Sequence, residues 1–220
     1  MTTQTPARSR RRSTSTDLAL IAGFAALIAI CAILPSLRLA GPVPITLQTF
    51  GVLLTGAVLG WRRGGLAVLL YLAVGAAGLP VFADGRSGFG VFAGPSAGYL
   101  VGFPLAAMLC GFIVERLPRR TIQTSIPAVF AAGLVSSAVF IHTLGMAGLV
   151  WRADMTWGQA FDIDKVFWIG DTLKNIAMAL VATAVHRAFP DLLDRPAAPA
   201  GDAAPAEDAA PAGDGSSGPA

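Results

Sequence analysis

Long hydrophobic runs dominate the chain, and polar residues collect in the short stretches between them. A run of about 20 apolar residues is long enough to cross a bilayer as a helix. Six runs approach or exceed this length, at residues 18–37, 47–61, 65–82, 96–117, 126–151 and 166–189. The pattern therefore predicts an all-α integral membrane protein with six transmembrane helices.

The two ends of the chain lack this pattern. Residues 1–16 are polar and rich in arginine, and residues 190–220 consist mainly of Ala, Pro, Gly and Asp. Neither composition buries enough apolar surface to offset the entropy lost on folding. We expect a disordered basic arm beside the lipid head groups at 1–16, a six-helix domain at 17–189 and a disordered tail at 190–220.

The positions of the basic residues predict the orientation, because short cytoplasmic loops carry an excess of Arg and Lys. With the N-terminus inside, the inner side holds Arg8, Arg10, Arg11, Arg12, Arg62, Arg63, Arg116, Arg119, Arg120, Arg187 and Arg195. The outer side holds only Arg38, Arg86, Arg152 and Lys165. We therefore expect both termini in the cytoplasm, and we attribute the net charge of +3 to topology, with no nucleic-acid partner.

The composition supports the membrane class and offers little else. The chain is 54% hydrophobic and only 13% charged, whereas soluble domains are about 25% charged. Cys31 and Cys110 fall in separate apolar runs, without the spacing of a disulfide framework or a metal site. We expect no cofactor and no metal.

The last hydrophobic run contains an acid and a base where apolar residues are expected. Asp171, Lys174 and Asn175 lie within it, and a charge near the middle of a membrane helix costs roughly 2.5–3.5 kcal/mol. Asp171 and Lys174 are three residues apart, so they share one helical face and lean toward the start of the helix. This predicts a polar pocket open to the outer side. The alternative is a structural pair, or a lysine that reaches the interface.

Two stretches could complete such a pocket. Pro42 and Pro44 hold the segment before the second run extended. The polar residues that follow, Thr46, Gln48 and Thr49, either cap a helix or contact a ligand. The glycine-rich stretch 75–99 carries Arg86 as its only cation, with Phe82, Phe89 and Phe92 interleaved and Tyr99 at its end. Tyr99 is either an interfacial anchor or a hydroxyl offered to a ligand.

Other polar residues receive simpler interpretations. Residues 151–165 include Asp154, Asp162 and Asp164 and read as a polar outer loop. A lone histidine such as His142 is usually buried and hydrogen-bonded within the protein. In the first run, Ala22/Ala26 and Ala25/Ala29 form two small-xxx-small pairs, which suit either internal packing or a partner helix.

Two enzyme-like motifs occur in the glycine-rich stretch. GPSAG at 94–98 fits a nucleophile elbow, and Gly88, Gly90 and Ala93 match a dinucleotide-binding pattern. Both motifs require strands that alternate with helices, which this chain does not predict. An intramembrane enzyme using Asp171 and Lys174 as acid and base would need further carboxylates or a metal set. We expect a protein that is not an enzyme.

Three motifs resemble one family: GPVPITLQTFGVLLTGAVLG at 41–60, GLPVFADGRSGFGVFAGPSAGYLVGF at 78–103 and GDTLKN at 170–175. They are similar to the BioY family, the biotin-binding substrate-specificity (S) components of energy-coupling factor (ECF) transporters. The resemblance covers roughly residues 18–189. It implies a six-helix bundle in the bacterial cell membrane that binds biotin at its outer face. It also implies partners, namely an energy-coupling transmembrane protein and ABC-type ATPase subunits, since the chain has no Walker motif.

The resemblance also implies roles for individual residues. Asp171 and Lys174 match the family's D-x-x-K pair, associated with ligand recognition. An ionised Asp171 could accept from the ureido N–H groups of biotin, and Lys174 could donate to an oxygen. Arg86 or Gln48 could hold the carboxylate end. Tyr99 lies in the matching loop-to-helix motif. Phe82, Phe89 and Phe92 could supply an apolar wall.

The alanines of the first run resemble the surface by which such components dock on the coupling protein. Three other readings stay open at the level of sequence: an S component for another small vitamin, an intramembrane enzyme, and a purely structural membrane scaffold.

Overall fold

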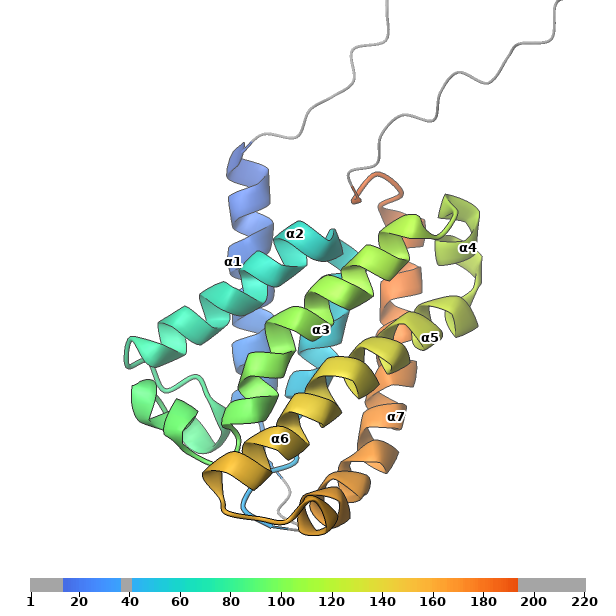
Figure 1. Ribbon diagram of the computed structural model, residues 1–220. Helices are drawn as coiled ribbons and strands as arrows, with labels where there is room; N and C mark the ends of the chain where they lie inside the picture. The colour runs from blue at the N-terminus through green and yellow to red at the C-terminus, as the bar shows by residue number, and fades with distance from the viewer. Residues whose placement is uncertain (1–13, 37–40, 194–220) are drawn as a thin grey trace, which may run out of the picture.

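The computed structural model describes residues 14–36 and 41–193, and the regular elements within these ranges are helices (Figure 1). They are α1 (Thr14–Ile33), α2 (Gln48–Ala76), the 3₁₀ turns η1 (Ala83–Gly85) and η2 (Phe89–Ala93), α3 (Ala97–Arg116), α4 (Arg119–Thr124), α5 (Ile126–Ser136), the π-helix η3 (Ser137–His142), α6 (Thr143–Arg152) and α7 (Trp157–Ala188). The predicted all-α class is confirmed for these residues. Helix α1 begins, and α7 ends, at the same end of the bundle as α4 (Figure 1).

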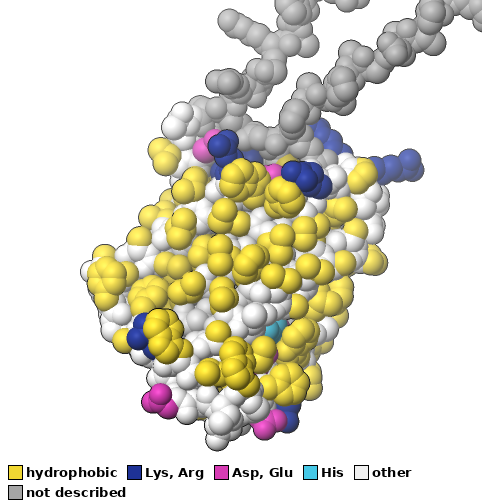
Figure 2. All heavy atoms as spheres, viewed as in Figure 1, with side chains coloured by type: hydrophobic (Ala, Val, Ile, Leu, Met, Phe, Trp, Pro, Cys, Tyr) yellow, Lys and Arg dark blue, Asp and Glu magenta, His cyan; other side chains and the backbone are white. Residues whose placement is uncertain are grey.

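Four helices are long and apolar enough to cross a membrane: α1, α2, α3 and the continuous stretch Ile126–Arg152 that joins α5, η3 and α6. On the face shown in Figure 2, apolar side chains spread along the side of the bundle, and most charged side chains lie near its two ends. Apolar residues that face outward include Ile30, Leu66, Val101, Val135 and Leu180. The chain is thus built as a multi-pass membrane protein.

Helix α2 contains most of the second and third predicted runs and bends at Gly60, near the end of the second. The helix ends at Ala76, so the third run was predicted six residues too long. Gly60 has φ 82° and ψ 178°, a backbone conformation that only glycine adopts readily.

The second half of α2 folds back on the first, and the two halves approach closely. A Cβ added at Gly64 would lie only 2.9 Å from the Cα of Gly56. The Trp61 backbone N–H donates to the Glu115 carboxylate at 3.1 Å, which ties this turn to the end of α3.

Small residues let the backbones of neighbouring helices approach closely. A Cβ added at Gly98 of α3 would lie 2.9 Å from the Cα of Gly148 in α6, and one at Gly102 would lie 2.7 Å from the carbonyl oxygen of Phe140 in η3. Ala106, one turn further along α3, is buried. The glycine and alanine face of α3 therefore packs against the fifth hydrophobic run.

The prediction of a polar loop at residues 151–165 is wrong. Helix α7 begins at Trp157, and Thr156 and Gln159 form a capping box around its first turn. Asp164 therefore lies in the second turn of a long helix, and its side chain is fully buried. The first turns of α7 are polar and so lack the apolar pattern from which the membrane helices were predicted. The Thr-x-x-Gln spacing, however, is a typical signal for the start of a helix.

Ordered residues extend into both of the expected tails. Helix α1 begins at Thr14, inside the expected arm, and Leu193, inside the expected tail, is buried against the bundle. Residues 1–13, 37–40 and 194–220, with Arg38 among them, lie outside the described residues. Disorder of the arm and the tail therefore stays a prediction for 1–13 and 194–220.

Candidate functional site

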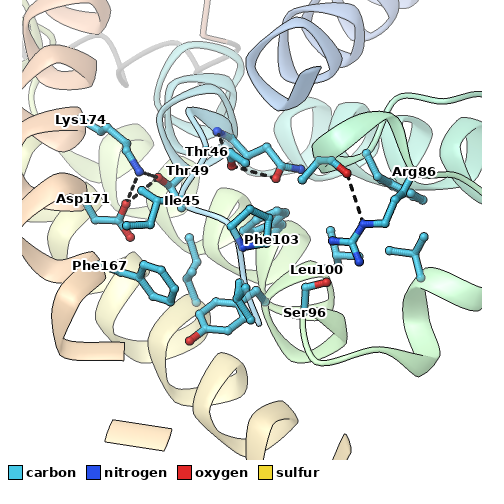
Figure 3. A pocket seen from close by; sticks show the side chains of 18 residues that line it. Ile45, Thr46, Thr49, Arg86, Ser96, Leu100, Phe103, Phe167, Asp171 and Lys174 are labelled. Carbon is cyan, nitrogen blue, oxygen red and sulfur yellow. Dashed lines mark hydrogen bonds and ion pairs between the residues drawn. The ribbon is translucent and has the colours of Figure 1, made fainter. Parts of the chain in front are cut away.

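A pocket opens between the start of α2, the start of α3 and the middle of α7, and the segments 43–46 and 82–96 form the rest of its wall (Figure 3). Counted together with its open mouth, the space between these walls is about 580 Å³. Its lining consists of Val43, Pro44, Ile45, Thr46, Gln48, Thr49, Phe82, Ala83, Arg86, Val91, Ser96, Tyr99, Leu100, Phe103, Ile141, Phe167, Asp171 and Lys174.

One side of the pocket carries the predicted acid and base. The Lys174 ammonium donates to Asp171 Oδ1 at 2.7 Å, and the Thr49 hydroxyl donates to the same oxygen at 2.9 Å. Lys174 Nζ also lies 3.4 Å from Thr49 Oγ1. The side chains of Lys174 and Asp171 are only 14% and 10% exposed. Thr49, one of the residues expected to cap a helix or contact a ligand, reaches Asp171 from the first turn of α2.

The opposite side of the pocket carries Arg86, and the apolar side chains of Phe103 and Leu100 lie between the two (Figure 3). Arg86 Nε donates to the carbonyl oxygen of Ala83 at 3.3 Å. No carboxylate of the described residues forms an ion pair with Arg86. The pocket thus has a zwitterionic end and a cationic end, separated by an apolar middle.

Gln48 lines the pocket, and its amide is already hydrogen-bonded. Its Nε2 donates to the Tyr71 hydroxyl at 2.6 Å, and its Oε1 accepts from the Thr46 hydroxyl at 2.9 Å. The Thr46 oxygen in turn accepts from the Gln48 backbone N–H at 3.2 Å. Gln48 thereby fixes the segment before α2 against the second half of that helix, and Thr46 supplies the hydrogen bond to the helix start.

Tyr99 also lines the pocket, but its hydroxyl is hydrogen-bonded to a residue inside the protein. The hydroxyl donates to Asp164 Oδ1 at 2.9 Å, and the ring packs edge-on against Phe167 with 5.7 Å between centroids. Tyr99 is buried, so it is neither an interfacial anchor nor a free hydroxyl. It connects the pocket wall to a buried acid behind it.

The aromatic residues of the outer loop divide into two groups. Phe82 lines the pocket and packs edge-on against Tyr71 at 5.5 Å and Phe92 at 5.8 Å between centroids. Phe92 supports Phe82 and does not itself line the pocket. Phe89 is 78% exposed and lies outside it. Among these three, only Phe82 can form the apolar wall.

Asn175 does not line the pocket, although it follows Lys174 in the chain. It is buried, and its Nδ2 donates to the carbonyl oxygen of Phe130 in α5 at 2.9 Å. Gly133 leaves room for the Asn175 side chain, because a Cβ added there would collide with Asn175 Oδ1. Asn175 therefore joins α7 to α5.

A second polar cluster lies behind the pocket, and sequence analysis missed it. Asp164 accepts hydrogen bonds from Tyr99 and, at 3.0 Å, from the Trp168 indole N–H, and His142 Nδ1 lies 3.0 Å from both of its oxygens. His142 is buried and hydrogen-bonded, as expected of a lone histidine. The available signal was spacing, because residues 164, 168 and 171 are four and then three apart and share one helical face.

The four alanines of α1 do not form one surface. Ala22 and Ala26 are exposed, Ala29 is half-buried and Ala25 is buried. A Cβ added at Gly23 would meet no atom within 4 Å. One small-xxx-small pair therefore faces outward beside a glycine, while the other turns toward the bundle.

The residues described here contain no cluster of three or more His, Cys, Asp or Glu side chains that could hold a metal ion. The pocket can therefore do two things with the groups it contains. Its paired and unpaired charges can orient a polar ligand, and its apolar middle can remove that ligand from water.

Curated relatives match most of this chain and nearly all of their own length. A biotin transporter BioY from Rhodobacter capsulatus is 42% identical over 190 residues, which cover 80% of this chain and 96% of that protein. A biotin transporter BioY from Rhizobium etli is 38% identical over 177 residues, which cover 79% of this chain and 95% of that protein.

Among solved structures, the crystal structure of the S-component for biotin from an ECF-type ABC transporter matches with a TM-score of 0.75 at 26% sequence identity. The match covers 80% of this chain and 95% of that chain. These three relatives are named as transporters or as a transporter component. The model of the BioY family matches residues 3–191, and so the resemblance of the three sequence motifs is confirmed: the chain belongs to the BioY family.

Proposed function

We propose that this protein takes up biotin across the bacterial cytoplasmic membrane as the substrate-binding component of an ECF transporter. The observation that carries the proposal is the pocket itself, with the Asp171 and Lys174 pair at one end and Arg86 at the other. Biotin has a matching division, with a polar ureido ring, an apolar middle and a terminal carboxylate. The family and its named biotin transporters support the same ligand.

The ureido ring belongs at the α7 side of the pocket. Asp171 Oδ1 already accepts from Lys174 and Thr49, so its second oxygen is the natural acceptor for a ureido N–H. Lys174 has three N–H donors and uses two of them toward Asp171 and Thr49. The third can donate to the ureido carbonyl. Charge-assisted hydrogen bonds of this kind are stronger than neutral ones.

The carboxylate of biotin belongs at the Arg86 side. A guanidinium binds a carboxylate through two parallel N–H donors, and Arg86 uses only its Nε toward the backbone of Ala83. Phe103, Leu100 and Phe82 line the distance between the two ends. Burial of the ring and chain against them adds about 25 cal/mol for each Å² of apolar surface removed from water.

We also propose six membrane spans with both termini in the cytoplasm. The turn at Gly60 makes two antiparallel spans of α2, and α7 is the sixth span despite its charges. Arg63, Arg119 and Arg187 contact Asp17, Asp191 and Gln123 respectively, at the end where α1 begins and α7 ends. The excess of basic residues at this end supports a cytoplasmic position. The pocket, at the other end, then opens outward.

Release of biotin inside the cell requires partners. We propose an energy-coupling transmembrane protein and ABC-type ATPase subunits, because the chain has no Walker motif of its own. The outward pair Ala22 and Ala26, with Gly23 between them, is the proposed contact with the coupling protein. Small side chains of this kind let a partner helix approach the backbone.

Uptake of labelled biotin tests the proposal. The protein would be expressed with and without a coupling module in a biotin-auxotrophic bacterial host that lacks its own biotin transporter. We expect uptake that unlabelled biotin competes away and that riboflavin and thiamine do not. Absence of uptake under both conditions, in cells whose membranes contain the protein, would contradict the transport function.

A further inference from the structure

His142 lies between two carboxylates that belong to different parts of α7. Its Nδ1 is 3.0 Å from both oxygens of Asp164, and its Nε2 is 3.6 Å from Asp171 Oδ2. The second distance is too long for a hydrogen bond but lies within the range of an ion pair. His142 is 2% exposed and Asp164 is 0% exposed. The ring thus links the buried cluster to the acid that lines the pocket.

The orientation of the ring is fixed by several neighbours. The Trp168 indole can only donate, and the Tyr99 hydroxyl donates as well, so Asp164 acts as an acceptor with both oxygens engaged. Nδ1 of His142 must then carry a hydrogen. The ring also stacks on Trp168, with 4.4 Å between centroids and 17° between planes. Neither rotation nor a flip of the ring preserves these contacts.

The backbone that carries His142 is unusual. His142 is the last residue of the π-helix η3, and π segments within α-helices occur often at functional sites. The carbonyl oxygen of Phe140, in the same segment, lies where only the missing side chain of Gly102 makes room. Helix α3 therefore holds η3 in place and sets the position of the imidazole relative to α7.

We propose that His142 is a positioning residue for ligand recognition, held by Asp164 so that its Nε2 side orients the Asp171 carboxylate toward the ligand; this rests on the proposed function. Lys174 and Thr49 hold one oxygen of Asp171, and His142 faces the other. The imidazole therefore occupies the side of the Asp171 carboxylate that neither Lys174 nor Thr49 contacts.

Two substitutions of His142 distinguish the contribution of Nδ1 from that of Nε2. An asparagine amide lies near the position of Nδ1, and a glutamine amide reaches the position of Nε2. His142→Asn therefore keeps a donor for Asp164 and loses the contact with Asp171, whereas His142→Gln keeps the donor toward Asp171. By isothermal titration with biotin we expect His142→Asn to weaken binding roughly tenfold and His142→Gln by less than about threefold.

A double-mutant cycle shows whether His142 acts through Asp171. In the Asp171→Asn background, His142→Asn should cost less than about twofold, because its target is already changed. A merely structural role would give the same loss in both backgrounds. His186 provides the matched control, as a buried histidine at the other end of α7 whose Nε2 lies 2.9 Å from the carbonyl oxygen of Ala57. His186→Asn and His186→Gln should leave biotin affinity unchanged.

Equal affinity of the Asn and Gln variants, or additive losses in the cycle, would overturn the proposal. If His142→Asn does not give monodisperse protein, Asp164→Asn replaces it, since it removes the charge that holds the ring at almost no change in size. It should weaken biotin binding at least about fivefold, and unchanged affinity would count against the proposal. Failure of the wild-type protein to bind biotin would instead refute the proposed function.

Discussion

The two buried histidines of the protein show how different the two ends of the bundle are. His142 faces two carboxylates, Asp164 and Asp171, at the pocket end. His186, at the other end of α7, is equally buried but lies against the backbone carbonyl of Ala57. Two equally buried histidines therefore have different surroundings. One lies between carboxylates at the pocket end, and the other joins two helices at the opposite end.

Helix α7 shows the same contrast along its length. The part of α7 from Trp157 to Lys174 places Asp164, Asp171 and Lys174 against α2, α3 and the fifth hydrophobic run. The part beyond Lys174 buries Met178, Ala179 and Ala182 in the apolar core. Charges inside a membrane protein are costly and persist where they are paired and serve a function. The contrast locates recognition in the part of α7 up to Lys174 and structural support in the part beyond it.

The largest expected effect is at the acid and base of the pocket. Asp171→Asn and Lys174→Ala should each weaken biotin binding at least about tenfold, because each leaves the remaining charge of a nearly buried pair without its partner. Titration of each purified variant measures the loss. Unchanged affinity in both variants, with the proteins monodisperse, would remove the pocket end as the recognition site.

The other end of the pocket should respond to one chemical group of the ligand. Arg86→Ala should weaken biotin binding by roughly tenfold, the lower end of the scale of one hydrogen bond to a charged group. Biotinamide, which lacks the carboxylate charge, should bind the wild-type protein and Arg86→Ala with nearly equal affinity. An equal loss for biotin and biotinamide would show that Arg86 does not recognise the carboxylate.

The membrane helices and the acid and base of the pocket could be predicted because each has a local signal in the sequence. The hydrophobic runs are continuous, the basic turn after Gly60 interrupts two of them, and Asp171 and Lys174 stand out in an apolar setting. Asp164 had no such contrast, since it follows other polar residues near the start of a run. Its burial depends on Tyr99 and His142, which come from distant parts of the chain.

Side-chain direction explains the remaining differences at the site. Phe82 and Phe92 look equivalent in sequence, but one lines the pocket and the other packs behind it. Asn175 follows Lys174, yet one residue along a helix turns a side chain by about 100°, and Asn175 points toward α5 instead. Sequence spacing indicated that Asn175 lies on the same helix as Lys174 but not which surface it faces.

Close packing between α3 and the π-helix should affect stability more than affinity. Gly102→Ala places a Cβ 2.7 Å from the carbonyl oxygen of Phe140, and overpacking of this kind costs about 1–3 kcal/mol. Thermal unfolding in detergent should show a lower midpoint. Gly23→Ala is the matched control, because its Cβ meets no atom within 4 Å. Similar midpoints for the two variants would contradict the packing described for Gly102.

The smallest effect is expected from the end of the chain. A protein truncated after Leu193 should bind biotin with wild-type affinity, because Leu193 packs at the end of the bundle opposite the pocket. Titration of the truncated protein measures this directly. A loss of biotin affinity would show that residues 194–220 contribute to the pocket end.

The central claim is that the pocket between Asp171 and Arg86 is a biotin site, and titration of the wild-type protein in detergent tests it most directly. The account predicts tight, saturable binding of one biotin per chain and no binding of riboflavin or thiamine. It also predicts a higher unfolding midpoint with biotin present, since a ligand that binds only the folded state stabilises it. Absence of both heat and stabilisation, in protein shown to be folded, would contradict the claim.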